Sequence, residues 1–90
     1  MGKLTCFEIP GLYLWFNTSD HRPPHFHAEH VGEWEVRVYF LSDPADPAKM
    51  FEQKWGMKLP SRQHLRALAR CTEEHRVQLL QEWHQKVQRG

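Results

Sequence analysis

The chain has 90 residues, of which 40% are hydrophobic and 26% are charged. Because separate cores need more chain than this, we expect a single domain over residues 1–90. Twelve basic and eleven acidic side chains give a net charge of +1, which excludes a strong overall attraction to nucleic acid or anionic lipid. Two cysteines, Cys6 and Cys71, are too few for a disulfide framework, and we expect them to act as small buried hydrophobic residues. With no signal-peptide pattern and no apolar stretch of about 20 residues, we expect a cytoplasmic protein without membrane contact.

The first part of the chain predicts β-strands. Residues 4–9 and 12–17 contain several residues of high β propensity, and Pro10 and Gly11 separate the two segments. A polar turn over residues 18–24 follows, and its Pro23-Pro24 pair forces extended backbone into the next segment. This order predicts an antiparallel meander of three to four strands.

Residues 25–29 and 33–41 predict a hairpin, and two loop lengths are open. A three-residue loop at His30-Val31-Gly32 would pair Glu29 with Glu33, His27 with Glu35 and His25 with Arg37. That loop gathers the apolar side chains on one face, opposite the histidines: Phe26, Ala28, Trp34, Val36, Val38 and Phe40. A two-residue Val31-Gly32 turn would place Trp34 beside the histidines and mix polar with apolar residues, so the three-residue loop is favoured.

The second half of the chain predicts helices after an irregular insertion over residues 42–59. In the insertion, Asp46 is a plausible N-cap, Pro47 a first helical residue, and Met50, Phe51 and Trp55 fit a short helix ended by Gly56. Pro60 and Ser61 begin a second helix with three inward residues: Leu65, Leu68 and Cys71. Thr72 is the expected cap of a last helix whose apolar stripe packs on the sheet: Val77, Leu80, Trp83 or His84, and Val87. The predicted class is α+β, an antiparallel β-meander followed by two C-terminal helices packed on one face.

Four of the seven histidines lie between positions 21 and 30. On an extended strand His25 and His27 point to the same face about 7 Å apart, within reach of one divalent metal ion such as zinc. His21 can fold back over the double-proline turn as a third nitrogen ligand. Glu29 and Glu35 can orient the imidazoles from outside the ligand set or act as a general base. The alternative is that all of these residues are polar groups on a solvated sheet face.

Arg62, Arg66 and Arg70 recur at four-residue steps and form a stripe that suits an acidic partner or phosphates. The alternative is a solvated helix face in which Arg70 pairs with Glu74. A helix-turn-helix over residues 60–90 is disfavoured, since no glycine lies between the helices and the charge is balanced. We therefore expect a protein partner and regard nucleic acid as the weaker candidate.

The motif His21-x-Pro23-Pro24-His25-Phe26-His27-Ala28, a Gly-Glu hairpin, Leu59-Pro60 and an ending from Glu74-His75-Arg76 to Trp83 form one pattern. The pattern resembles the small prokaryotic domain-of-unknown-function 4160 family, although the 42–59 insertion is longer than we expect there. Such proteins often lie beside toxin–antitoxin-like genes, and the resemblance implies a centre at His21, His25 and His27. We expect a regulatory or interaction module of a toxin–antitoxin-like gene pair. The alternative is a metal-dependent hydrolase using a histidine-bound divalent ion.

Overall fold

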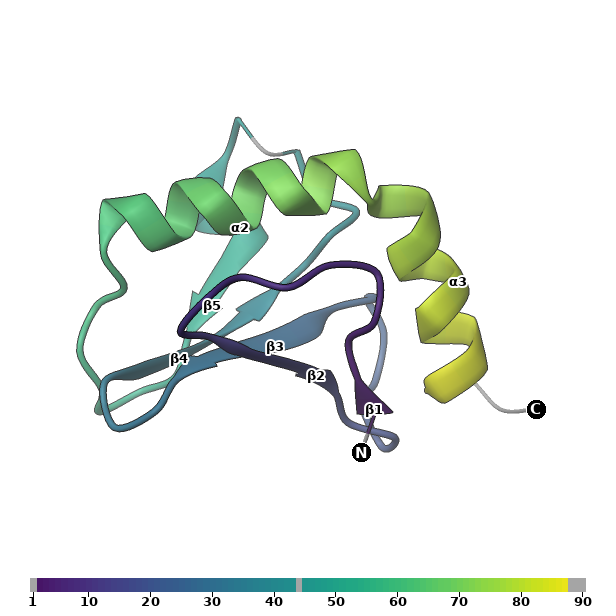
Figure 1. Ribbon diagram of the computed structural model, residues 1–90, viewed down its shortest axis with the longest axis horizontal. Helices are drawn as coiled ribbons and strands as arrows, with labels where there is room; N and C mark the ends of the chain where they lie inside the picture. The colour runs from purple at the N-terminus through teal and green to yellow at the C-terminus, as the bar shows by residue number, and fades with distance from the viewer. Residues whose placement is uncertain (1, 44, 88–90) are drawn as a thin grey trace.

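The computed structural model describes residues 2–43 and 45–87, which form a five-stranded sheet and three helices. The elements in chain order are β1 (Gly2–Lys3), β2 (Tyr13–Phe16), β3 (Phe26–His30), β4 (Trp34–Val38), α1 (Pro47–Met50), β5 (Phe51–Gln53), α2 (Arg62–Glu74) and α3 (Arg76–Lys86). All strand pairs are antiparallel and neighbours in the sheet are neighbours in the chain. Figure 1 shows α2 running over one face of the sheet and α3 descending at one end of it. The predicted α+β meander is confirmed, with one strand more than expected.

The first predicted strand, residues 4–9, lies almost entirely outside the sheet. Only Gly2 and Lys3 pair with β2, and Leu4 adds one further backbone hydrogen bond to Leu14. The next two backbone N–H groups, those of Thr5 and Cys6, donate to the carboxylate of Glu82 in α3. The segment is therefore held against α3 and not against the sheet, because the Glu82 side chain satisfies the backbone groups that a strand would have paired.

The β3–β4 hairpin has a three-residue loop, but its register differs from the prediction by two residues. His27 lies opposite Arg37, and Glu29 lies opposite Glu35. The loop comprises residues 31–33, with Gly32 at a φ of 77° and a hydrogen bond from the N–H of Glu33 to the carbonyl of His30. Alternation has a period of two, so it cannot separate registers that differ by two residues. The predicted apolar face is buried for the same reason: Phe26, Ala28, Trp34, Val36, Val38 and Phe40.

The 42–59 segment is more regular than expected. Helix α1 begins at Pro47 with Asp46 at the N-cap position, but it ends at Met50. Phe51 begins β5, which pairs with the outer edge of β4 and satisfies backbone groups that would otherwise remain open there. The predicted helix reaching Trp55 is therefore wrong, and that side chain is 96% exposed.

Helix α2 begins where predicted and ends later. The Ser61 hydroxyl accepts the N–H of His64, as an N-cap side chain does. Thr72 does not cap a helix, because it lies inside α2 and is fully buried, and the break between α2 and α3 falls at His75.

The apolar stripe of α3 also differs from the prediction. Leu79, Trp83 and Val87 are buried, whereas Val77 is exposed. The predicted and observed stripes share Trp83 and Val87. Because a helix has 3.6 residues per turn, the residue three before Trp83, Leu80, and the residue four before it, Leu79, both lie near its face, and the structure buries Leu79. Leu80, expected to pack on the sheet, is only partly buried against the core.

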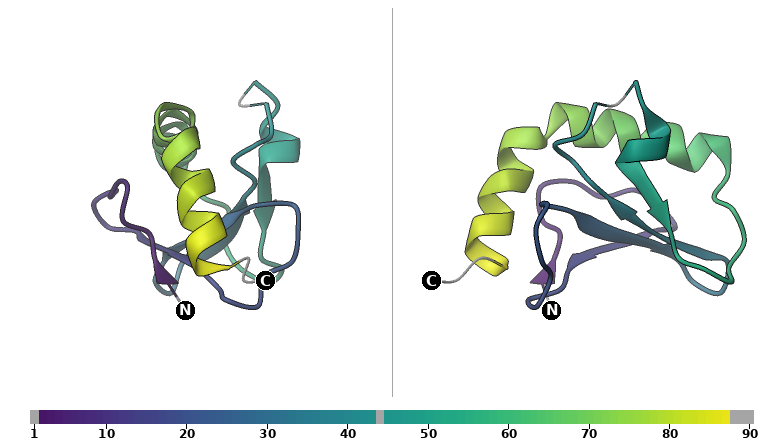
Figure 2. Two further views of the ribbon diagram at one scale, coloured as in Figure 1. Left: turned by 90° about the vertical axis from the view of Figure 1, so that its right-hand side faces the viewer. Right: turned by 180° about the vertical axis from the view of Figure 1, so that it is seen from behind.

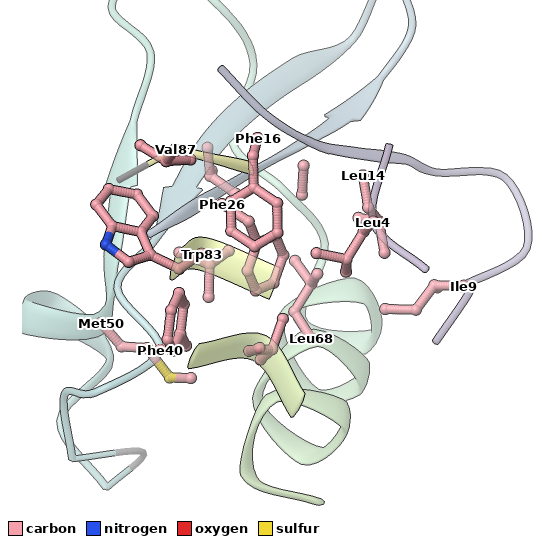
Figure 3. Packing of buried hydrophobic residues seen from close by; sticks show 14 of the residues in the cluster. Leu4, Ile9, Leu14, Phe16, Phe26, Phe40, Met50, Leu68, Trp83 and Val87 are labelled. Carbon is pink, nitrogen blue, oxygen red and sulfur yellow. The ribbon is translucent and has the colours of Figure 1, made fainter. Parts of the chain in front are cut away.

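The core fills the space between the sheet and the two long helices, as the close-up in Figure 3 shows. Trp83 of α3 is 1% exposed and makes an edge-to-face contact with Phe16 of β2 at 6.2 Å between ring centroids. Figure 2 shows α3 lying across one end of the sheet, so the helix covers the point at which β3 begins. None of the described helices is long and apolar enough to cross a membrane.

Candidate metal centre

Three side chains converge where β3 begins. His27 lies in β3, His25 directly precedes that strand, and Asp20 comes from the loop that joins β2 to β3. One ligand atom from each lies within 4.8 Å of the others. The two histidine side chains are 5% exposed and that of Asp20 is 11% exposed. Two imidazoles and a carboxylate are a ligand set that zinc accepts.

The tautomer of His25 leaves a nitrogen free for a cation. Its Nδ1 lies 2.9 Å from the carbonyl oxygen of Pro23, an acceptor only, so this nitrogen carries the proton and donates. The lone pair then sits on Nε2, which is buried without a hydrogen-bond partner and lies 3.5 Å from Oδ2 of Asp20. Metal-ligating histidines are commonly held by such a bond from the second ring nitrogen to a carbonyl.

Nε2 of His27 has two polar neighbours, and neither neutral form of the imidazole can hydrogen-bond to both of them. This nitrogen is 2.9 Å from Oδ2 of Asp20 and 3.2 Å from Nδ2 of Asn17. The Asn17 amide is oriented by Trp15, whose indole N–H donates to Oδ1, so the amide turns its N–H groups towards the imidazole. A proton on Nε2 donates to the carboxylate but offers no acceptor to the Asn17 amide, whereas a lone pair there accepts from the amide but repels the carboxylate. A cation between Nε2 and the carboxylate removes that repulsion.

Aromatic rings surround the two imidazoles. The ring of Trp15 stacks on His27 at 5.1 Å, while Tyr39 and Trp83 contact His25 at 5.2 and 5.7 Å. These contacts hold the ring planes and exclude water from the nitrogens. The alternative that His25 and His27 lie on a solvated sheet face is therefore wrong.

The ligand group differs from the expected set in one member. The side chain of His21 is exposed and lies outside the group, and Asp20, its neighbour in sequence, supplies the third ligand atom. The sequence-based prediction gave Asp20 no role. The signal that could have found it is its position in the same turn, since carboxylates are ordinary zinc ligands.

Glu35 lies opposite Glu29 and not, as predicted, opposite His27. Its carboxylate forms an ion pair with Lys54 at 3.6 Å. The residue opposite His27 is Arg37, as the shifted register requires. Glu35 nevertheless lines the same groove as His27, together with Asn17, Arg37, Lys54 and Trp55 among others.

The predicted arginine stripe lies on the outer face of α2. The side chains of Arg62, Arg66 and Arg70 are exposed and line a shallow groove with Gln63 and Ala67. Within residues 2–43 and 45–87, no ion pair joins any of the three to an acidic side chain, so the alternative pairing of Arg70 with Glu74 is not formed.

The two free cysteines are in environments that suppress the thiolate. Burial, followed by the neighbouring Glu82 carboxylate, raises the pKa of Cys6 to about 12. Burial and the charge of Glu74 raise the pKa of Cys71 above its ordinary value. Nucleophilic thiols require the opposite shift, so neither cysteine is a candidate nucleophile.

The comparisons with known proteins bear on the family alone. The chain has no significant match among curated proteins or solved structures. The family model described as a domain of unknown function, DUF4160, matches residues 11–84, which include Asp20, His25 and His27, all of α2, and α3 as far as His84. With most of its length covered by that model, the chain belongs to the DUF4160 family.

Proposed function

We propose that this protein binds a divalent metal ion, zinc by preference, through Asp20, His25 and His27. We further propose that the domain so organised is a regulatory or interaction module of a toxin–antitoxin-like gene pair. The observation that carries the metal proposal is the buried convergence of three ligand atoms within 4.8 Å, with Nε2 of His25 unpartnered. Burial of a polar nitrogen without a partner costs free energy, and a bound cation would offset that cost.

Enclosure of the site favours an organising metal over a catalytic one. The three ligand side chains are 5%, 5% and 11% exposed, and aromatic rings wall the imidazoles. A catalytic zinc needs an open coordination position that substrate can reach. A metal held at this site would instead fix the loop between β2 and β3 against the sheet, and so preserve the surface that a partner contacts.

The arginine stripe on α2 supports an acidic protein partner. The backbone positions of its three arginines lie about 6 Å apart along the helix axis, since four residues rise that distance. They are exposed and unpaired in the described part of the chain, so binding carboxylates would break no existing ion pair. The small net charge of the chain confines its cationic character to local features such as this stripe.

A zinc titration followed by calorimetry tests the metal centre. We expect the parent to bind zinc, and Asp20→Asn, His25→Gln and His27→Gln each to lower the affinity at least about tenfold, because each removes one ligand. His21→Gln is the matched control, since this exposed neighbour lies outside the ligand group. No binding to the parent, or equal affinities for all variants, would refute the site. Loss of binding in the control alone would restore His21 as a ligand.

Co-purification with the product of the adjacent reading frame tests the module. We expect Arg66→Glu to abolish the complex, because the stripe would then repel an acidic surface, and we expect Lys49→Glu to leave it intact. Both side chains are exposed, and Lys49 lies away from α2 in α1. A complex that survives Arg66→Glu, or no complex with the parent, contradicts the proposal.

A metal-dependent hydrolase is the second candidate, and one observation favours it. His27 and Glu35 line a single groove, so a carboxylate stands where a general base could act on a water near the metal ligands. The zinc-loaded protein would then hydrolyse chromogenic esters or phosphoesters, and Glu35→Gln would reduce the rate about 100-fold or more with zinc affinity unchanged. A rate equal to that of the apoprotein rules out this candidate.

A further inference from the structure

A second pair of histidines lies at the opposite end of the β3–β4 hairpin. His30 is the last residue of β3, and His64 lies in the first turn of α2. Their ring centroids are 5.6 Å apart, and both rings contact Trp34, at 6.1 and 5.4 Å. Segments distant in the sequence thus bring two imidazoles together on one aromatic side chain.

We propose that His30 and His64 form a second metal site, one that takes a transition-metal ion with a preference for imidazole, such as Zn²⁺. The spacing of the rings suits this ion. Two imidazoles on a tetrahedral zinc, with Zn–N bonds of about 2 Å, hold their ring centroids about 5 Å apart. The His25–His27 pair of the first centre has a centroid separation of 5.1 Å.

The hydrogen bonds of the two rings leave nitrogens for a metal. Nδ1 of His30 is buried without a hydrogen-bond partner. Nδ1 of His64 lies 3.0 Å from the Ser61 hydroxyl, and that oxygen also accepts the backbone N–H of His64 at 3.2 Å. When Nδ1 of His64 donates to the hydroxyl, Nε2 carries the lone pair and the serine fixes the ring plane.

The surroundings supply room and a negative charge. Both histidines line a pocket with Glu33, Trp34, Lys58, Leu59 and Ser61. Glu33 is held at this pocket by an ion pair with Lys58 at 2.9 Å. In the described part of the chain only Asp20, His25 and His27 offer three ligand atoms within 4.8 Å, so the second site has two protein nitrogens and needs water, or a rotated Glu33, to complete it. We therefore expect weaker binding here than at the first centre.

A metal at this position would join the hairpin to the start of α2. The arrangement is independent of the first centre, because it uses different residues, loops and nitrogens. Binding to the native state alone stabilises it by mass action, so the second site predicts a zinc-dependent gain in stability that persists when the first centre is removed.

Zinc titration of the parent and three variants separates the two sites. Calorimetry should give two equivalents for the parent, one for His64→Gln, and one weaker equivalent for His25→Gln combined with His27→Gln. His84→Gln, which removes an exposed histidine of α3, is the control and should keep two. A parent stoichiometry that His64→Gln leaves unchanged overturns the second site, and zero for the double variant does the same without affecting the first.

Ring-nitrogen NMR of the parent avoids reliance on variants that fail to fold. Zinc should shift one ring ¹⁵N resonance of His30 and one of His64 at concentrations beyond saturation of the first centre. Unmoved resonances for both rings would show that the pair is an aromatic packing contact only. Movement at His25 and His27 in the same spectra reports separately on the first centre.

Discussion

Cys6 illustrates how one buried neighbour decides the chemistry of a single residue. Its thiol lies beside the Glu82 carboxylate, which ionises readily because the hydrogen bonds it accepts lower its pKa. Burial and this negative charge raise the pKa of the thiol from 9.0 to about 12. Folding therefore favours the protonated thiol, so its contribution to stability is present below pH 9 and is lost as the pH rises towards 12.

The reactivity of Cys6 follows from the same shift. In a Cys71→Ser background, alkylation by iodoacetamide at pH 8 should be at least about 100-fold slower for the folded protein than for the protein in denaturant, because the thiolate is the nucleophile. Mass spectrometry after timed quenching measures both rates. Similar rates in the two states would mean that the thiol is neither buried nor near the carboxylate.

At the scale of elements, Glu82 connects the last helix to the first residues of the chain. Its carboxylate accepts the backbone N–H groups of Thr5 and Cys6 and forms an ion pair with Lys86 at 2.7 Å. Lys86 also donates to the carbonyl of Lys3. Burial by itself would raise the pKa of Glu82, but the bonds from Lys86, Cys6 and Thr5 outweigh it and lower the pKa.

Glu82→Gln should destabilise the protein at pH 7 by about 1–3 kcal/mol, the usual loss for a charged hydrogen-bond acceptor. The folded-state pKa lies below 4.5, so this contribution is complete above pH 4.5 and is lost as the pH falls through the folded-state pKa. The difference between parent and variant in urea midpoint should therefore shrink in acid. Glu73→Gln, at an exposed position of α2, is the control. A difference independent of pH contradicts the assigned charge.

At the scale of the whole molecule, Trp83 belongs to both the core and the wall of the candidate metal centre. It is 1% exposed, packs on Phe16 of the sheet and contacts the ring of His25. The same side chain thus anchors α3 and closes one wall of the candidate site. A substitution that removes the packing of Trp83 is therefore expected to lower stability and also to disturb the geometry around His25.

Trp83→Ala should cost about 3–5 kcal/mol, as for other large aromatics removed from cores. Small domains are stable by about 5–15 kcal/mol, so the variant should be near its unfolding threshold. Denaturant midpoints measure the loss. Trp55→Ala removes the same side chain from a position that is 96% exposed and should change stability by no more than about 0.5 kcal/mol. Coincident midpoints for Trp83→Ala and the parent would place this residue outside the core.

The sequence by itself determined the features that depend on near neighbours. Period-two alternation identified the apolar face of β3 and β4, a serine followed by a helical pattern identified the start of α2, and the spacing of His25 and His27 put both rings on one side of an extended chain. Each of these rests on local geometry within a few residues. Local geometry also explains why the predicted fold class was correct.

Only the tertiary structure decided which distant groups meet. The hairpin register, the choice of Asp20 over His21, the burial of the imidazoles by Trp15, and the bond of Glu82 to Thr5 all depend on the path of loops between elements. Alternation is unchanged by a two-residue shift, and a turn leaves several nearby side chains able to reach the same point. Packing of the whole chain selects among these local equivalents, because each buried polar group must find a partner and each apolar face a cover.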